Sequence, residues 1–472
     1  MEKRKIVILG GGISGLAAGY FLARTGHYQV TILEKADETG GVCGSFQYHG
    51  FTLDYGAHKL YSVIPDFMND IKSLMGKDLI EVPKKHRIFL NGRLLDYPLK
   101  FSALLKTLNL MEVAKLGAGF AWQSVKNLFN HKEDRNYEDY VIRRFGRPAY
   151  QLVFEPMAEK IWGNPSTLHA DIAKTRIPSS GAWELVLKLL HLKKESQETN
   201  ANSFYYPREG FKGFPLALKN EILQNGGEIF TGAQITALTL KNGQINGVTG
   251  LVGGNEKTFS CDILISSIPI ADLSALLGEH ISDYRLNDIE SLQLRHVVLV
   301  YLLLNRQKVF DDQWIFVPGR DCLFSRVFEP KNIFPGLGPA GQTVICCDFT
   351  TYPDDDTWKS SDEALSCRCL QDLVKMGFVS ASEVRHCIVK RFENFYPRYD
   401  INYRSRLDRV LNSFGQFQNL VVTGRLGMYN YNNVDHCFDM GRCIAEGLEQ
   451  GKQGRQIIDQ LRARIRDYKI VD

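Results

Sequence analysis

The sequence lacks any apolar run of the roughly 18–20 residues that a membrane span requires. The nearest candidate, residues 101–129, is interrupted by Lys106, Glu112, Lys115 and Lys126. Its apolar residues recur at helical spacing, which is typical of helices packed on a core. Peripheral contact with a membrane surface stays open as an alternative.

Metal-binding spacing is absent as well. The ten cysteines lie at irregular positions, and the pairs Cys346/Cys347 and Cys367/Cys369 have no matching second pair. We therefore expect buried reduced thiols and no metal site. The first residues, MEKRKIVIL, pass directly into an apolar stretch without a leader pattern, which predicts a cytoplasmic protein.

The chain also lacks a strong charge of either sign. A net charge of +4 is small for 472 residues, so no general affinity for nucleic acids is expected. Local basic residues can still bind a small anionic substrate. A length of 472 residues suits two or three domains, and the oligomeric state is left open.

What the sequence does contain is a dinucleotide-binding pattern at its start. The apolar stretch IVIL runs into Gly10, Gly12 and Gly15, and the next strand-like run ends on Glu34. The first glycine permits a tight turn, the second lets backbone N–H groups approach a pyrophosphate, and the third allows helix and strand to pack closely. The acidic residue can accept a hydrogen bond from a ribose hydroxyl.

The patterns along the chain predict an α/β fold with a doubly wound, Rossmann-like domain. We expect this domain to be discontinuous and to consist of residues 1–60, 216–285 and 415–472, with CDILISSIPIADL as a buried returning strand. Residues 61–215 predict a mostly helical insertion, and residues 286–414 a substrate domain with a mixed sheet. The insertion and this sheet together form an α+β substrate region.

Two hairpins and one loop are predicted within these parts. Asn91-Gly92 and Asn242-Gly243 each lie between apolar alternating runs, which indicates tight hairpin turns. The polar segment LKKESQETNANS at 192–203 lacks periodicity and predicts an exposed loop.

GGGISGLAAGYFLA, LEKADETGGVCGSF, the returning strand and GRLGMYNYNN together resemble the FAD-binding superfamily of amine oxidases, protoporphyrinogen oxidases and UDP-galactopyranose mutases. The resemblance implies FAD as the cofactor, bound by the Rossmann-like domain. It implies that Gly40 and Gly41 pass the pyrophosphate and that the backbone of Ile235 pairs with adenine. The implied cofactor-binding residues are Gly10, Gly12, Gly15, Glu34, Lys35, Gly40, Gly41, Ser45, Ile235, Gly424, Arg425, Asn433 and Val434.

Within the superfamily, six segments resemble the mutases most: LDYGAHKLYS, IFLNGRLLDYPL, IWGNPSTL, KTRIPS, SRVFEPKNI and GRLGMYNYNN. The resemblance implies that Arg326 neutralises a substrate diphosphate, that Tyr431 hydrogen-bonds it, and that Arg425 and His58 lie near flavin and sugar. The implied catalytic residues are His58, Arg326 and Tyr431. The implied substrate-binding residues are Trp162, Arg176, Arg326, Tyr352, Tyr429 and Tyr431.

Three positions depart from the superfamily patterns. Ser180 stands where the mutases have a second arginine, Asn433-Val434 where they have an acidic residue and Met, and Val42 where oxidases usually have an arginine. One alternative is therefore a FAD-dependent oxidoreductase that removes hydride from a C–N or C–C bond. A non-catalytic binding protein, similar to the prenyl-GTPase escort proteins, is another.

Several site residues also have a purely structural interpretation. Arg326 could form a salt bridge to Glu329, His58 could be a satisfied structural histidine, and Trp162 could be a core aromatic. Tyr429 and Tyr431 alternate with asparagines, so one of the two sets could face solvent.

Overall fold

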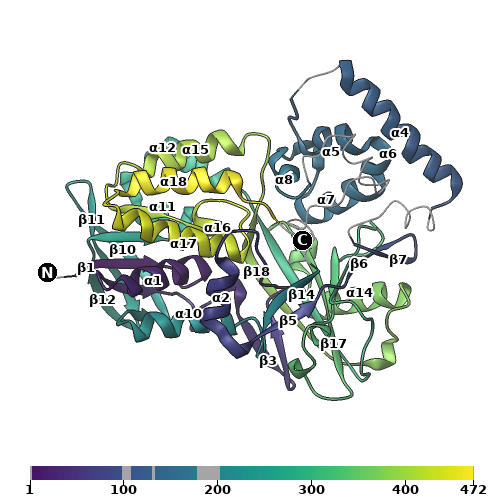
Figure 1. Ribbon diagram of the computed structural model, residues 1–472, viewed down its shortest axis with the longest axis horizontal. Coiled ribbons are helices and arrows are strands. Elements are labelled where there is room, and N and C mark those ends of the chain that lie inside the picture. The colour runs from purple at the N-terminus through teal and green to yellow at the C-terminus, as the bar shows by residue number, and fades with distance from the viewer. Residues whose placement is uncertain (1–2, 98–107, 130–132, 178–201, 471–472) are drawn as a thin grey trace.

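The computed structural model describes residues 3–97, 108–129, 133–177 and 202–470 (Figure 1). Its first layer is a five-stranded sheet in which every pairing is parallel. In spatial order the strands are β19 (Leu420–Val422), β13 (Ile263–Ser266), β1 (Arg4–Leu9), β2 (Tyr28–Leu33) and β9 (Glu228–Phe230). The predicted doubly wound α/β fold is confirmed, and so is the buried returning strand, which is β13.

Glycines bring helices close to this sheet and to one another. At Gly19 of α1 (Ile13–Thr25), a Cβ would lie 2.8 Å from the Ile32 side chain of β2. At Gly441 of α17 (Val434–Glu449), a Cβ would lie 2.6 Å from the backbone of Ala17. Because neither contact leaves room for a side chain, α1 packs tightly between the sheet and α17.

A seven-stranded mixed sheet forms the second layer. In spatial order its strands are β18 (Val384–Pro397), β14 (Leu294–Leu304), β17 (Thr343–Thr351), β16 (Arg326–Phe328), β15 (Trp314–Phe316), β6 (His86–Leu90) and β7 (Arg93–Asp96). Along β14 the odd-numbered residues from Val297 to Leu303 belong to the main core, and the even-numbered ones pack toward α14 (Asp362–Lys375). Burial on both faces explains why this strand reads as a continuous apolar run.

Both predicted hairpins are confirmed. β6 pairs with β7 across Asn91-Gly92, and β10 (Ala233–Lys241) pairs with β11 (Gln244–Val252) across Asn242-Gly243. All four turn residues have positive φ, as a tight hairpin turn requires. The hairpin β6–β7 extends the seven-stranded sheet through a parallel pairing of β6 with β15, so residues of the predicted helical insertion also enter this sheet. The domain boundaries themselves stay a prediction.

The insertion contributes mainly helices in its described part (Figure 1). Between residues 108 and 177 these are α4 (Leu110–Phe129), α5 (Tyr137–Phe145), α6 (Arg147–Ala149), α7 (Glu155–Trp162) and α8 (Asp171–Lys174). No helix among residues 3–97, 108–129, 133–177 and 202–470 is long and apolar enough to cross a membrane. The predicted loop at 192–203 lies almost entirely outside the described residues, as does Ser180.

The remaining elements connect or cover these layers. The strands are β3 (Ser45–Tyr48), β4 (Phe51–Asp54), β5 (Leu79–Pro83), β8 (Ser203–Pro207) and β12 (Asn255–Ser260). The helices are α2 (Phe67–Met75), α10 (Gly213–Gln224), α11 (Ile270–Leu277), α12 (Asp283–Glu290), α13 (Asp356–Lys359), α15 (Tyr403–Phe414), α16 (Gly424–Gly427) and α18 (Gly454–Asp467). All ten cysteines are free thiols. Eight of them are buried as predicted, whereas Cys387 is half-buried and Cys367, on the outer side of α14, is exposed.

Candidate functional site

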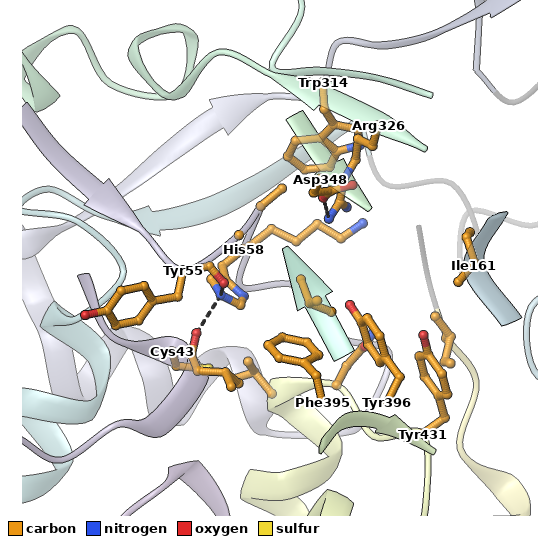
Figure 2. A pocket seen from close by; sticks show the side chains of 18 of the residues that line it. Cys43, Tyr55, His58, Ile161, Trp314, Arg326, Asp348, Phe395, Tyr396 and Tyr431 are labelled. Carbon is orange, nitrogen blue, oxygen red and sulfur yellow. Dashed lines mark hydrogen bonds and ion pairs between the residues drawn. The ribbon is translucent and has the colours of Figure 1, made fainter. Parts of the chain in front are cut away.

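A cavity of about 220 Å³ is enclosed by segments from both layers (Figure 2). Residues 55–61 and the N-terminal end of α17 form one side, and the strands β14 to β18 of the mixed sheet form the other. The sequence-predicted residues that line it are His58, Arg176, Arg326, Arg425, Tyr431, Asn433 and Val434. The fold thus gathers seven predicted residues that are up to 376 positions apart in the chain.

The glycines predicted to hold a dinucleotide meet at the N-terminus of α1. The N–H of Gly40 donates to the carbonyl oxygen of Gly11 at 2.8 Å, and Gly12 forms a parallel bridge with Gly40. A Cβ at Gly424 would lie 2.7 Å from Oγ of Ser14 in the first turn of α1. Three loops that are distant in sequence therefore converge on one helix end.

This convergence fits FAD. Gly12 precedes α1 without any side-chain cap, no acidic residue occupies the first turn, and a Cβ at Gly12 would meet no atom within 4 Å. Uncapped N–H groups beside open space are what a pyrophosphate requires. Gly10, Gly12, Gly40, Gly41 and Gly424 would hold the pyrophosphate part of the cofactor here, while Gly15 keeps α1 against the strand.

The other predicted cofactor residues occupy different positions. Both carboxylate oxygens of Glu34 already accept backbone N–H groups, from Gly11 at 2.6 Å and Ala36 at 2.8 Å. Ile235 lies on β10, which begins where the N–H of Ala233 donates to the Glu34 carbonyl oxygen. Lys35 is exposed. Ser45 is buried and used internally, because its hydroxyl donates to Asp54 at 2.6 Å.

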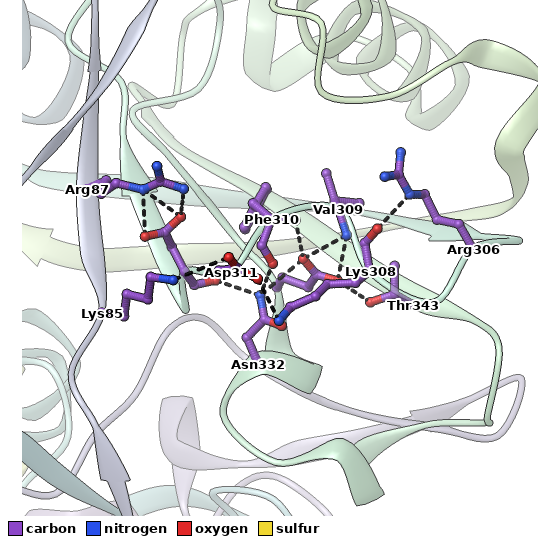
Figure 3. Close-up of polar contacts among 11 residues, drawn as sticks. Lys85, Arg87, Arg306, Lys308, Val309, Phe310, Asp311, Asn332 and Thr343 are labelled. Carbon is purple, nitrogen blue, oxygen red and sulfur yellow. Dashed lines mark hydrogen bonds and ion pairs between the residues drawn. The ribbon is translucent and has the colours of Figure 1, made fainter.

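Arg326 pairs with Asp348 rather than with Glu329. Its Nε lies 2.7 Å from Oδ2 of Asp348, which stands directly opposite on the neighbouring strand. Glu329 points into a separate network, where it accepts from Thr343 and from the N–H groups of Val309 and Phe310 (Figure 3). The carboxylate of Asp348 therefore fixes the Arg326 guanidinium at the cavity wall.

A stack of cations and aromatic rings forms another wall of the cavity. The Arg176 guanidinium lies 4.3 Å from the centroid of the Tyr431 ring, and Tyr431 stacks on Tyr396 at 4.9 Å with ring planes 5° apart. Arg425 lies 5.3 Å from the Tyr396 ring, and its own guanidinium donates to the carbonyl oxygen of Asn432. Cation–π contacts of this kind hold the guanidinium groups in place.

His58 is a neutral hydrogen-bond donor in this structure. Its Nε2 lies 2.9 Å from the carbonyl oxygen of Val42 and 3.2 Å from that of Tyr55. Carbonyl oxygens only accept, so Nε2 carries the proton. Burial, supported by the nearby charge of Arg425, lowers the pKa of His58 to about 4. His58 thus ties residues 55–58 to the glycine loop without carrying a charge.

This histidine predicts a pH-dependent stability. Between pH 4 and 6.5 the unfolded chain binds a proton at His58 that the folded chain does not, so stability falls as the pH is lowered through this range. We expect wild type to lose roughly 2–3 kcal/mol more than His58→Gln between pH 7 and 4. Urea unfolding of both proteins across this range measures the difference, and parallel curves would contradict the neutral assignment.

Three predicted substrate residues do not line the cavity. Trp162 is buried behind it, with the Arg176 guanidinium 5.1 Å from its ring. The hydroxyl of Tyr352 donates to the Trp162 carbonyl oxygen at 3.1 Å. Tyr429 is 1% exposed, and its hydroxyl donates to backbone oxygens of Gln293 and Arg398. Trp162 supports the stack from behind, whereas Tyr352 and Tyr429 have structural contacts.

Sequence reasoning missed several lining residues. Lys59 lines the cavity together with Trp314, Asp348 and Tyr396. Lys59 directly follows His58, so its position in the same motif was a signal that could have been used. The other three lie on strands whose pairing partners no local pattern reveals.

Comparison with known proteins decides the family. Residues 13–442 match the family described as flavin containing amine oxidoreductase. The chain belongs to this family. It is a FAD-dependent enzyme with the oxidoreductase fold of its relatives, and this excludes the non-catalytic alternative.

Full-length relatives have different activities. The chain is 18% identical to coproporphyrinogen III oxidase of Bacillus subtilis, over 93% of this chain and 97% of that protein. It is 21% identical to human protoporphyrinogen oxidase, over 94% and 98% of the two chains. A reduced UDP-galactopyranose mutase superposes with a TM-score of 0.85 at 17% identity, covering 99% and 98%. At such identities the likeness shows the shared fold.

Proposed function

We propose that this flavoenzyme acts on a small anionic substrate of the nucleotide-activated sugar class, in a mutase-like isomerisation. The observation that carries the proposal is the number of cations in one cavity: Lys59, Arg176, Arg326 and Arg425 line it, against the carboxylates Asp348 and Asp435. Asp348 is paired with Arg326, and Asp435 accepts from Ser62 at 2.6 Å. The remaining positive charge suits a diphosphate.

The geometry assigns different parts to these residues. Arg326, oriented by Asp348, would bind phosphate oxygens, and Arg176 would add charge from its position against the Tyr431 ring. Burial raises the pKa of Tyr431 well above its ordinary value, so its phenol stays protonated and can donate to a phosphate oxygen. FAD, when bound, would supply the isoalloxazine ring that reacts with the sugar carbon. Neutral His58 would orient the loop beside it.

The alternative is a net oxidoreductase of the amine oxidase or protoporphyrinogen oxidase type, which removes hydride from a C–N or C–C bond. The aromatic lining of the cavity supports this alternative, because aromatic side chains can also pack against a cyclic substrate. The lining aromatic residues in question are Trp314, Phe316, Phe395, Tyr396 and Tyr431. The two full-length oxidase relatives favour the same class.

An anaerobic spectral titration distinguishes the two. The flavin-loaded protein, oxidised or reduced with dithionite, is titrated with UDP and with UDP-sugars while the flavin absorption band is followed. Tighter binding to the reduced protein, with an isomeric sugar product and no net electron consumption, supports the proposal. The proposal would be overturned if no nucleotide changed the flavin absorption while an amine or a porphyrinogen reduced the flavin.

Arg326→Gln tests the anionic site directly. We expect the dissociation constant for UDP to rise about tenfold to a hundredfold, because a charge-assisted hydrogen bond contributes about 1.5–3 kcal/mol. Arg326→Lys keeps the charge but loses the planar fork, so we expect an intermediate effect. Isothermal titration calorimetry with the flavin-loaded protein measures both.

Arg320→Gln is the matched control, because this arginine is half exposed and pairs with Glu155 and Glu159 outside the cavity. Its affinity for UDP should equal that of wild type. An unchanged dissociation constant in Arg326→Gln would remove Arg326 from the substrate site.

A further inference from the structure

Helix α4 presents an unusual amount of apolar surface to solvent. Six of its large hydrophobic side chains are exposed, and five of them are at least 69% exposed. Elsewhere in the described residues no large hydrophobic side chain exceeds 49%. The six are Leu110, Met111, Trp122, Val125, Leu128 and Phe129. Contiguous apolar patches of this kind mark interaction surfaces.

The opposite face of α4 contacts α5 and α6, although no residue of α4 is fully buried. Asn127 donates to the carbonyl oxygen of Arg143 in α5 at 2.7 Å. A Cβ at Gly119 would overlap the ring of Pro148 in α6, so the two helices are in direct contact there. Asn109 caps the helix, because its side chain accepts from the N–H of Glu112 at 2.8 Å, and the Glu112 side chain accepts from the N–H of Asn109 at 2.9 Å. The exposed apolar face therefore points away from α5 and α6.

The charges on α4 are distributed asymmetrically. Lys115 and Lys126 are exposed among the apolar residues, whereas Glu112, the one carboxylate of the helix, is only partly exposed and engaged in the cap. The outer face thus combines aliphatic side chains, two aromatic rings and positive charge. This is the composition of helices that lie in the interface of an anionic bilayer.

We propose that α4 docks the enzyme on the surface of an anionic lipid bilayer. The apolar residues would enter the headgroup region, and the two lysines would meet lipid phosphates. The helix has 20 residues, so about 30 Å of it can lie along the membrane plane. Figure 1 shows α4 at the outer edge of the molecule, where a flat surface can reach it. The inference stands independently of the substrate proposed above.

Sedimentation of the flavin-loaded full chain with vesicles tests the proposal. We expect binding to phosphatidylcholine vesicles that contain phosphatidylglycerol, with weaker binding to phosphatidylcholine alone and at high salt. Leu128→Ser/Phe129→Ser should lower the partition coefficient at least tenfold. Lys115→Gln/Lys126→Gln should lower it roughly fivefold for each lysine, on the anionic vesicles only.

The matched control is Leu223→Ser/Val374→Ser, which removes two apolar side chains that are 44% and 43% exposed on other helices. This control should bind vesicles like wild type. Flavin content and thermal unfolding of each variant show whether it is folded.

Fluorescence of Trp122, taken as the difference between wild type and Trp122→Phe, should be quenched by brominated lipid.

Two results would overturn the proposal. One is a wild-type chain that stays in solution with both kinds of vesicle. The other is a dimer by light scattering that dissociates in Leu128→Ser/Phe129→Ser, because a second copy of the chain would then cover α4. Unquenched Trp122 fluorescence in sedimented protein would contradict docking through this helix.

Discussion

Gly15→Val is expected to abolish flavin binding and to lower the free energy of unfolding by about 3 kcal/mol or more. A Cβ at Gly15 would overlap the carbonyl oxygen of Gly10 and lie 3.2 Å from Oγ of Ser267. The first obstacle is backbone of the turn that leaves β1. The second is the Ser267 hydroxyl, which lies within hydrogen-bond distance of the carbonyl oxygens of Leu9 and Gly10 in the same turn, so a side chain at Gly15 would displace the helix from the sheet. Urea unfolding and the flavin content after purification measure the effect.

Gly12→Ala separates folding from cofactor binding. A Cβ at Gly12 would meet nothing within 4 Å in the chain, and the residue's φ of −71° is ordinary for alanine. We therefore expect wild-type stability but weaker FAD binding, because the added methyl group would stand where a pyrophosphate approaches the helix end. Equal flavin affinity in Gly12→Ala and wild type would contradict that position for the pyrophosphate.

Asp54→Ala is expected to cost about 3–5 kcal/mol of unfolding free energy. The carboxylate is buried and accepts from the Ser45 hydroxyl at 2.6 Å, from the N–H of Phe211 at 2.9 Å and from the Tyr206 hydroxyl. Truncation would leave these three buried donors without their acceptor. Residues 55–61 at the cavity wall follow directly, so flavin content should fall as well.

Asp54→Asn is the control for shape. An amide of the same size keeps one oxygen acceptor for Phe211 and Ser45, and Tyr206 can accept from its nitrogen. We expect this variant to lose about 1–2 kcal/mol in urea unfolding. If Asn and Ala at this position destabilised the chain equally, charge rather than hydrogen bonding would account for the stability at Asp54.

The fold and the glycine-rich turn before α1 were predictable because their signals are local. A strand, a glycine turn and a helix follow one another within Arg4–Thr25, and hairpin turns are specified by the dipeptides Asn91-Gly92 and Asn242-Gly243. In each case, a few adjacent residues determine the backbone conformation. The sequence also predicted that CDILISSIPIADL returns to the parallel sheet, because a short, fully buried strand is strongly apolar.

Side-chain partners across strands could not be predicted in the same way. Arg326 has a carboxylate three residues away in Glu329, yet it pairs with Asp348, which the register of β16 and β17 places opposite. Tyr429 and Tyr431 occur in one short motif, but positive φ at Tyr429 turns its ring toward Tyr399 and away from the cavity. Register and single-residue turns depend on tertiary packing, which no local pattern encodes.

The edge strand β19 has a consequence for the timing of folding during synthesis. It joins the parallel sheet beside β13, and α17 then packs against α1, although both elements come from the last 53 residues of the chain. A ribosome releases them only after nearly the whole polypeptide has been made. Until then, the apolar face of α1 that packs against α17 stays uncovered in the N-terminal βαβ unit. We therefore expect FAD to bind only after these residues have been synthesised, and chains truncated before Leu420 to bind no flavin.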